Sequence, residues 1–158
     1  MERVAIALGS NLGQRRAHLE RAITLLHSDL SDMAVSDFVE TEPVGVEPQP
    51  RFLNGALTGH WHLDARSLLE RLLDLEQACG RCRPHPGAPR TLDLDLILFG
   101  AWTIDEAGLS VPHPRFRQRE FVLRPLTQIA PDMIDPTTGL TIGELYRRWK
   151  EHHACASH

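Results

Sequence analysis

Residues 89–100 (PRTLDLDLILFG) alternate apolar and polar side chains with a period of two, the pattern of a β-strand with two different faces. Asp93 and Asp95 share one of these faces. Desolvating a carboxylate without a partner costs several kcal/mol, and two adjacent carboxylates also repel each other. The strand therefore needs an apolar core on one side and a polar or cationic environment on the other. The apolar face carries four leucines: Leu92, Leu94, Leu96 and Leu98.

The aspartate pair has three interpretations. A divalent cation between the carboxylates would offset their repulsion, and hard oxygen ligands on a rigid strand, with Arg90 just upstream, are typical of a magnesium–nucleotide site. A solvated strand face and a pair of structural ion pairs with arginines are the alternatives. The pattern favours the metal site.

The composition predicts a single globular domain spanning residues 1–158. The net charge of -4 argues against a nucleic-acid-binding protein, which would carry a basic surplus. Nearly all basic residues are arginine, which indicates either a compositional bias of the genome or an anionic ligand. No apolar run approaches the ~20 residues that span a bilayer, and the first residues lack a signal-peptide pattern. We therefore expect a cytoplasmic protein that does not bind membranes.

The order of elements predicts the fold class. We expect a strand at 4–8, a helix at 16–26, strands at 33–39 and 52–61, a helix capped by Asp64, and then the aspartate strand. This order is typical of the split βαβ, ferredoxin-like arrangement. We predict an α+β fold, with a ferredoxin-like βαββαβ core and a mainly antiparallel sheet in a layered α/β/α sandwich with extra C-terminal elements.

After the aspartate strand, residues 102–104 are expected to pair back on it across a turn near Gly100. Helices are predicted at 121–129 and 140–149, the second capped by Thr141 with Glu144 three residues later. Residues 151–158 are polar, and we expect a frayed tail there.

Two further motifs favour structural roles. Residues 9–13 (GSNLG) lack the ending of a Walker loop, so we interpret them as a strand-to-helix turn. Cys79 and Cys82 form a CxxC motif without a clear fourth metal ligand, which favours Cys79 as a small core residue.

Three other side chains allow both a structural and a binding role. His113 lies between two prolines, and three arginines follow within six residues, so a phosphate contact is as reasonable as a structural role. Phe52 and Phe121 are expected in the core unless a flat heterocycle binds between them.

Several of these segments together resemble the 6-hydroxymethyl-7,8-dihydropterin pyrophosphokinases of folate biosynthesis. The run PRTLDLD is highly specific for that family, whereas the other segments would be weak alone. The resemblance covers residues 4 to about 149. The matching segments, in family order, are residues 7–13, 41–45, 52–54, 76, 80–83, 89–100, 111–113 and 119–121.

The resemblance implies that a diphosphate is transferred from ATP to the hydroxymethyl group of the pterin with release of AMP, by a monomer that acts on small molecules. Two Mg²⁺ ions are implied, bound by Asp93 and Asp95. The implied catalytic positions are Arg83, Arg90, Asp93 and Asp95. The positions implied around ATP are Glu76, Arg83, Arg90, Leu96, Ser110, His113 and Arg119. The positions implied around the pterin are Thr41, Pro43, Val44, Phe52, Asn54 and Phe121.

Two alternatives come from other functional classes. A ferredoxin-like binding module without catalysis would have lost an aspartate or both Arg83 and Arg90, and all of them are present. Another Mg²⁺-dependent phosphotransferase would release ADP instead of AMP, so the nucleotide product distinguishes it.

Overall fold

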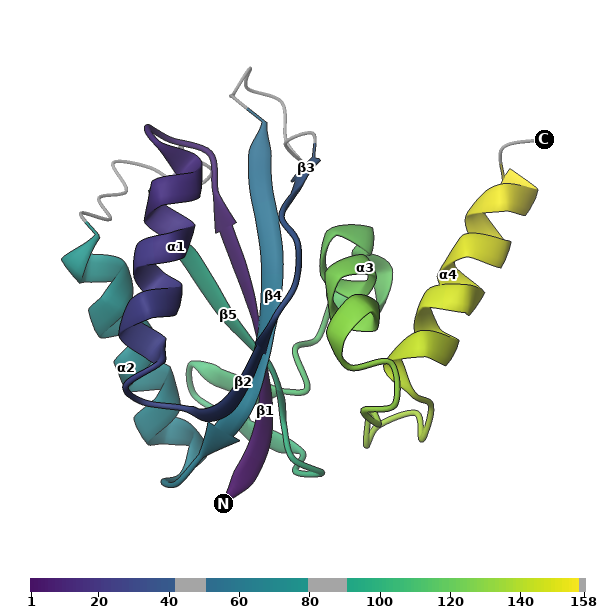
Figure 1. Cartoon of the computed structure of the whole chain (residues 1–158). Coiled ribbons are helices and arrows are strands. Elements are labelled where there is room, and N and C mark those ends of the chain that lie inside the picture. The colour runs from purple at the N-terminus through teal and green to yellow at the C-terminus, as the bar shows by residue number, and fades with distance from the viewer. Residues whose placement is uncertain (42–50, 80–90, 157–158) are drawn as a thin grey trace.

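The computed structural model describes residues 1–41, 51–79 and 91–156. Its main sheet has the strand order β2-β4-β1-β5, with the short β3 also paired to β4 (Figure 1). Every pairing among these described strands is antiparallel. The strands are β1 (Glu2–Ser10), β2 (Ser31–Val35), β3 (Val39–Thr41), β4 (Phe52–Trp61) and β5 (Asp93–Phe99).

The helices form a layer on each face of this sheet (Figure 1). Helices α1 (Arg15–Leu26) and α2 (Ala65–Ala78) cover one face. Helices α3 (Glu120–Ile129) and α4 (Ile142–Ala156) lie on the other, after the 3-10 turn η1 (Phe116–Gln118). The layered α+β fold with a ferredoxin-like element order is therefore confirmed.

Strand β1 contributes side chains to two hydrophobic cores, large ones to the first and small ones to the second. Its large residues, Val4, Ile6 and Leu8, pack into the core beneath α1 and α2. Its small residues Ala5 and Ala7 belong to the second core, beneath α3 and α4. Because alternate side chains of a strand point to opposite faces, one strand supplies both cores.

A β-bulge changes the expected face of one leucine. Ala5 pairs with Leu98 and Ile6 with Leu96, so Ile97 is the extra residue in β5. An extra residue reverses the alternation beyond it. Leu94 and Leu96 pack into the α1/α2 core as predicted, but Leu98 lies in the α3/α4 core. The prediction that all four leucines share one face is wrong for Leu98.

The strand predicted at 33–39 is two strands, β2 and β3, separated around Ser36. The Ser36 hydroxyl accepts a hydrogen bond from the Ala56 N–H at 2.9 Å, and so replaces a ladder bond at the break. Asp37 then leaves the sheet edge and contacts α3, where it exchanges two 2.9 Å hydrogen bonds with Gln128.

The predicted pairing of residues 102–104 with β5 is also wrong. Ile104 begins β6 (Ile104–Glu106), which pairs with β7 (Leu109–Val111) in a separate hairpin turned by Gly108. Gly108 has a φ of +76°, a conformation that favours glycine. The turn at Gly108 therefore pairs β6 with β7, and not with β5.

Helix caps agree with the sequence, but the C-terminal end does not. Asp64 caps α2 by accepting a hydrogen bond from the Ser67 N–H at 2.9 Å, and Thr141 with Glu144 forms the predicted capping box of α4. The frayed tail predicted for 151–158 is wrong for 151–156, which continue α4. The rings of Trp149 and His153 stack there with their centroids 3.7 Å apart, which supports an additional helical turn.

None of the helices in the described part of the chain combines the length and apolar character needed to cross a membrane.

Candidate active site

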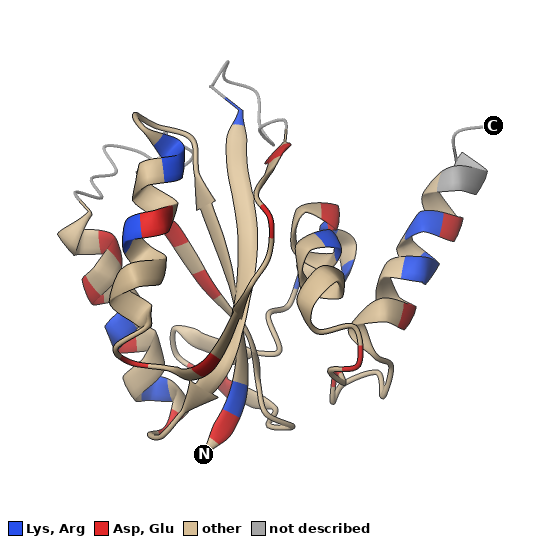
Figure 2. Cartoon of the chain, in the orientation of Figure 1, with Lys and Arg blue, Asp and Glu red and all other residues tan. Residues whose placement is uncertain are grey.

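The candidate site is built on the α3-facing side of three neighbouring strands. Strand β1 lies between β4 and β5, and Gly9 is the register partner of both Asn54 and Asp93. One step along the strand, Ala7 is the partner of Asp95. With strands spaced about 4.8 Å apart, Asn54 and Asp93 stand roughly 10 Å apart across Gly9. Figure 2 shows the acidic positions of β5 as red bands on this strand.

Gly9 is required here by a close approach. A Cβ atom at Gly9 would lie 3.0 Å from Asn54 Oδ1 and 3.6 Å from Phe52 Cδ1. The sequence interpretation placed Gly9 in a turn, but β1 continues through Ser10, so that assignment is wrong. With Ala7 as its neighbour on this face, Gly9 gives the site a floor of small residues.

Asn54, Phe52 and Thr41 meet at one end of this floor. Asn54 is buried, and its Nδ2 donates a hydrogen bond to Thr41 Oγ1. Thr41 is also the register partner of Phe52, whose ring is half-buried. Phe121 lies in the first turn of α3 and packs partly against the core on this same side of the sheet. These four side chains offer one amide and two aromatic rings to a ligand.

The other end of the floor holds charged groups. Asp93 and Asp95 are half-buried, and His113 is attached to the same strand because its N–H donates to the Ile97 carbonyl at 2.9 Å. Burial lowers the pKa of His113, nearby Arg119 and Arg115 lower it further, and Asp93 opposes them. The imidazole is therefore close enough to Arg119 and Asp93 to interact with both charges.

Hydrogen bonding also selects a tautomer of His113. Its Nδ1 accepts a hydrogen bond from the Arg115 N–H at 3.1 Å. The proton of the neutral ring consequently lies on Nε2, which makes this nitrogen a donor. Arg119 places its guanidinium 5.5 Å from the centroid of the Phe121 ring, and its charge also acts on His113. Such a cluster can bind an anion attached to a heterocycle.

The other three described residues that were predicted to contact the nucleotide are a buried glutamate, a core leucine and an exposed serine. Glu76 is on α2, only 2% exposed, and its Oε2 accepts a hydrogen bond from the Leu94 N–H at 2.7 Å. Leu96 directs its side chain into the α1/α2 core, so a nucleotide would meet its backbone only. Ser110 is exposed on β7. Their nucleotide contacts stay predictions.

Arg117 belongs to a structural ion pair. Its Nε and Nη2 donate to the buried carboxylate of Asp135 at 2.6 and 2.9 Å. Arg117 is one of the three arginines that follow His113 in the sequence. In the structure, its ion pair with Asp135 attaches η1 to the connection between α3 and α4.

Four predicted site residues lie outside the described part of the chain: Pro43, Val44, Arg83 and Arg90. Cys82 lies there too, whereas Cys79 is a buried free cysteine in the α1/α2 core, as predicted.

The acidic pair fits a magnesium ion that also binds substrate. Among residues 1–41, 51–79 and 91–156, no group of three or more His, Cys, Asp or Glu side chains is placed to hold a metal. Mg²⁺ is normally bound by one or two carboxylates together with substrate phosphates and water. Asp93 and Asp95, two hard oxygen donors on one face of a strand, match that requirement.

The small residues Ala7 and Gly9 were missed as part of the site by sequence reasoning. A signal for them exists in β1, where large and small side chains alternate. A strand that places Val4, Ile6 and Leu8 on one face and only small residues on the other indicates close packing or a ligand on the small face.

The chain is similar in sequence to one family of known enzymes. The family model for 7,8-dihydro-6-hydroxymethylpterin-pyrophosphokinase (HPPK) matches residues 5–131. The 2-amino-4-hydroxy-6-hydroxymethyldihydropteridine pyrophosphokinase of Bacillus subtilis is 42% identical over 149 residues, covering 92% of this chain and 89% of its own. The enzyme of the same name from Pseudomonas aeruginosa is 39% identical, covering 84% of this chain and 83% of its own.

Solved structures show the same fold. A crystal structure of an HPPK-DHPS in complex with substrates superposes with a TM-score of 0.79 at 14% identity, covering 96% of this chain and 44% of that one. The wild-type HPPK-DHPS of Plasmodium falciparum with SDX-DHP superposes with a TM-score of 0.71 at 15% identity, again over 44% of the larger chain.

The fold and site define an α+β domain with a mainly antiparallel sheet that carries paired carboxylates on one strand. The chain belongs to the 7,8-dihydro-6-hydroxymethylpterin-pyrophosphokinase (HPPK) family. Membership confirms the resemblance found in the sequence, together with the pyrophosphokinase activity in folate biosynthesis and the use of ATP as co-substrate.

Proposed function

We propose that this chain transfers diphosphate from ATP to the hydroxymethyl group of 6-hydroxymethyl-7,8-dihydropterin, and that the reaction takes place above the row Asn54–Gly9–Asp93. This row carries the proposal because one glycine separates an amide suited to a heterocycle from a carboxylate suited to a metal–phosphate group. The separation of roughly 10 Å is suited to two substrates bound end to end.

The pterin is assigned to the end with Asn54. Its amide can exchange hydrogen bonds with the polar edge of a pterin, and its contact with Thr41 sets the orientation of the amide. Phe52 and Phe121 are assigned to the two ring faces, as both are partly exposed aromatic side chains on this side of the sheet. Pro43 and Val44 are assigned to the same substrate from the sequence.

The triphosphate is assigned to the end with Asp93 and Asp95. His113 can donate from Nε2 to a phosphate oxygen, and Arg119 adds a permanent positive charge. Arg83 and Arg90 are assigned to the same phosphates from the sequence, as are Glu76, Leu96 and Ser110 to the nucleotide. We propose that Asp93 and Asp95 hold two Mg²⁺ ions, which would supply charge neutralisation of the phosphates when bound.

The chemistry then depends mainly on alignment. The pterin hydroxyl attacks the β-phosphorus of ATP, the bond from that phosphorus to the α-phosphate oxygen breaks, and AMP leaves. The hydroxyl proton is released as the new P–O bond forms. Asn54 and the aromatic rings orient the nucleophile, while His113 and Arg119 stabilise charge on the phosphates.

The nucleotide product tests this proposal. Purified protein is incubated with MgATP and the reduced hydroxymethylpterin, and AMP is separated from ADP. Pterin-dependent formation of AMP with equimolar pterin diphosphate is expected. Formation of ADP, or turnover that does not depend on the pterin, would contradict it.

We also propose that residues 1–158 act as one pyrophosphokinase domain, since both cores share a single sheet. A monomeric state, a cytoplasmic location and the absence of nucleic-acid or membrane partners remain predictions from the sequence. Light scattering of the purified protein and fractionation of cells would test the first two.

A further inference from the structure

Helix α1 begins with residues that local electrostatics disfavours. Arg15 and Arg16 occupy its first turn, at the end where the helix dipole stabilises anions. This turn holds no acidic residue, and Gln14 at the N-cap makes no side-chain capping hydrogen bond. A local conflict of this kind indicates that the side chains make a compensating contact elsewhere.

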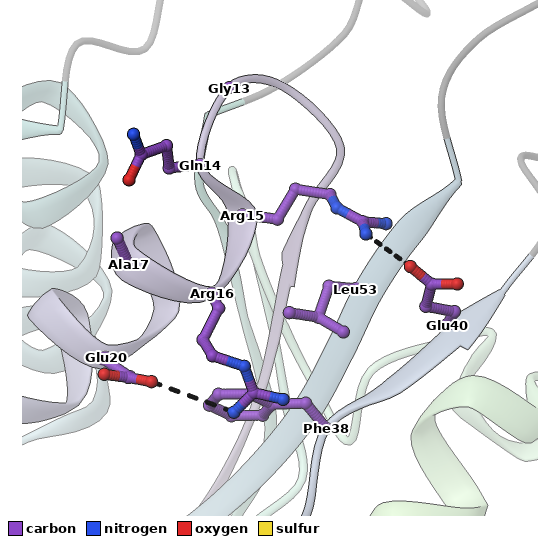
Figure 3. Close-up of a pocket in the computed structure, with 9 residues that line it drawn as sticks. All are labelled: Gly13, Gln14, Arg15, Arg16, Ala17, Glu20, Phe38, Glu40 and Leu53. Atoms are coloured by element: carbon purple, nitrogen blue, oxygen red, sulfur yellow. Dashed lines mark hydrogen bonds and ion pairs between the residues drawn. The ribbon is translucent and has the colours of Figure 1, made fainter.

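Arg15 makes that contact with the side chain of Glu40 and the backbone of Arg51. Its Nη2 pairs with Glu40 Oε1, and its Nη1 donates to the Arg51 carbonyl at 2.7 Å. Glu40 precedes Thr41, the last residue of β3, and Arg51 precedes Phe52, the first residue of β4. Figure 3 shows the Arg15 side chain extending from the start of α1 to Glu40.

The bridge lies on the opposite side of the sheet from the candidate site. Arg15 and Glu40 line a pocket of about 720 Å³ between α1 and β3, together with Arg16, Phe38 and Leu53. Leu53 packs into the α1/α2 core, whereas its neighbours Phe52 and Asn54 face α3. Arg15 therefore cannot touch a ligand bound at Asn54, and any effect on that ligand is transmitted through the strands.

Strand β3 needs such support because it is short and lies at the sheet edge. It has three residues, all paired with β4, whereas strands usually have five or six. Its last residue, Thr41, accepts the hydrogen bond from the Asn54 amide. A shift of β3 along β4 would therefore change the orientation of the amide assigned to the pterin.

We propose that Arg15 is a positioning residue for the pterin: by joining Glu40 to the Arg51 carbonyl, it fixes the register partners Thr41 and Phe52 next to Asn54 before the substrate binds. This inference rests on the proposed function, because it takes Thr41, Phe52 and Asn54 as pterin contacts. A ligand site whose groups are already ordered loses less entropy on binding.

The test compares the KM values for the two substrates. Arg15→Ala is expected to raise the KM for the pterin about tenfold, with kcat and the KM for ATP changed less than about twofold, because only binding of the pterin is weakened. Arg15→Lys keeps the charge but loses the planar fork that reaches two acceptors, so an intermediate KM is expected.

Arg71→Ala is the matched control. Arg71 also belongs to a partly exposed ion pair, at 2.8 Å from Asp29, and it lies on α2 away from β3. This variant should leave the KM for the pterin unchanged. The double variant of Arg15→Ala with Glu40→Ala should have a KM no higher than about that of Arg15→Ala alone, because the two residues act as a unit.

A pterin KM for Arg15→Ala within twofold of wild type would overturn the inference, as would an equal increase in Arg71→Ala. Should Arg15→Ala fail to fold, Glu40→Gln tests the same bridge with a smaller change. An unchanged pterin KM in Glu40→Gln would also overturn the inference. Asn54→Ala separates the two proposals. If it raises the pterin KM and the Arg15 variants do not, only the role of Arg15 is wrong; if it has no effect, the pterin assignment itself is wrong.

Discussion

The Glu76 carboxylate accepts a hydrogen bond from the Leu94 N–H, the backbone group between Asp93 and Asp95. Among the described strands, β5 is the last in the sheet order, so N–H groups along its outer edge have no further described strand as a partner. A side chain from α2 therefore fixes the segment that carries both aspartates. Because Glu76 is 2% exposed, this contact is protected from water.

Glu76→Ala should lower both stability and turnover. The buried Leu94 N–H would lose an acceptor, which costs about 1–3 kcal/mol in free energy of unfolding, and the aspartates would lose their alignment. Glu76→Gln keeps an acceptor oxygen, so its stability and turnover should be closer to those of the wild type. Urea denaturation and steady-state kinetics measure the two effects. Equal loss of ATP affinity in both variants would instead indicate direct contact between the Glu76 carboxylate and the nucleotide.

Asp95→Asn should lower kcat by at least about a hundredfold, because one of the two charged metal ligands would be lost. Asp74→Asn is a suitable control, since Asp74 is exposed on α2. Both variants should have thermal unfolding midpoints close to wild type. A near-wild-type kcat for Asp95→Asn would refute the proposed metal role.

Gly9→Ala should weaken pterin binding more than ATP binding. The added methyl group would lie 3.0 Å from Asn54 Oδ1 and displace that amide. Gly59→Ala is the matched control, because its methyl group would be equally close to Leu30 Cβ but on the α1/α2 side. The control should lose stability and retain pterin affinity. Fluorescence titration of the pterin and thermal unfolding would distinguish these results.

The buried Asp135 should contribute stability that disappears in acid. Burial raises the pKa of Asp135, but hydrogen bonds from Arg117, Thr138 and Thr137 outweigh it and hold the pKa below its ordinary value of 3.8. The unfolded chain therefore takes up this proton at a higher pH than the folded protein. The stability from the charged form is fully present above pH 3.8 and is lost as the pH falls through the lower, folded pKa.

Asp135→Asn tests this relationship. Near neutral pH the variant should be less stable than wild type by about 1–3 kcal/mol, because Arg117 loses its charged partner. The difference should narrow as the pH is lowered below 3.8. Urea unfolding at a series of pH values measures it, and a difference independent of pH in that range would contradict the expected ionisation of Asp135.

The element order and most segment boundaries could be predicted from the sequence because they depend on local patterns. The run 52–61, the Asp64 cap and the Thr141–Glu144 capping box all carry their signal within a few residues. The placement of Leu98 could not be predicted in this way. It depends on a bulge that is defined only by the pairing of β5 with β1.

Site residues whose side-chain chemistry alone indicates a role could be predicted from the sequence. Residues whose role depends on a contact with a distant part of the chain could not. Paired aspartates indicate a cation from their charge alone. The roles of Glu76 and Arg15 depend on contacts 18 and 36 residues away, with the Leu94 N–H and the Arg51 carbonyl. A backbone group is present at every position, so no sequence pattern marks these partners.

Strand β1 serves the two cores through alternate residues, and this has a consequence for how the protein can vary. Substitutions at Val4, Ile6 and Leu8 should reduce the yield of folded protein, because these side chains fill a packed interior. Enlarging Gly9, the neighbouring position on the other face, should give folded protein with altered substrate affinity. A saturation library of this strand, scored once for abundance and once for turnover, should therefore show two tolerance profiles that are offset by one residue.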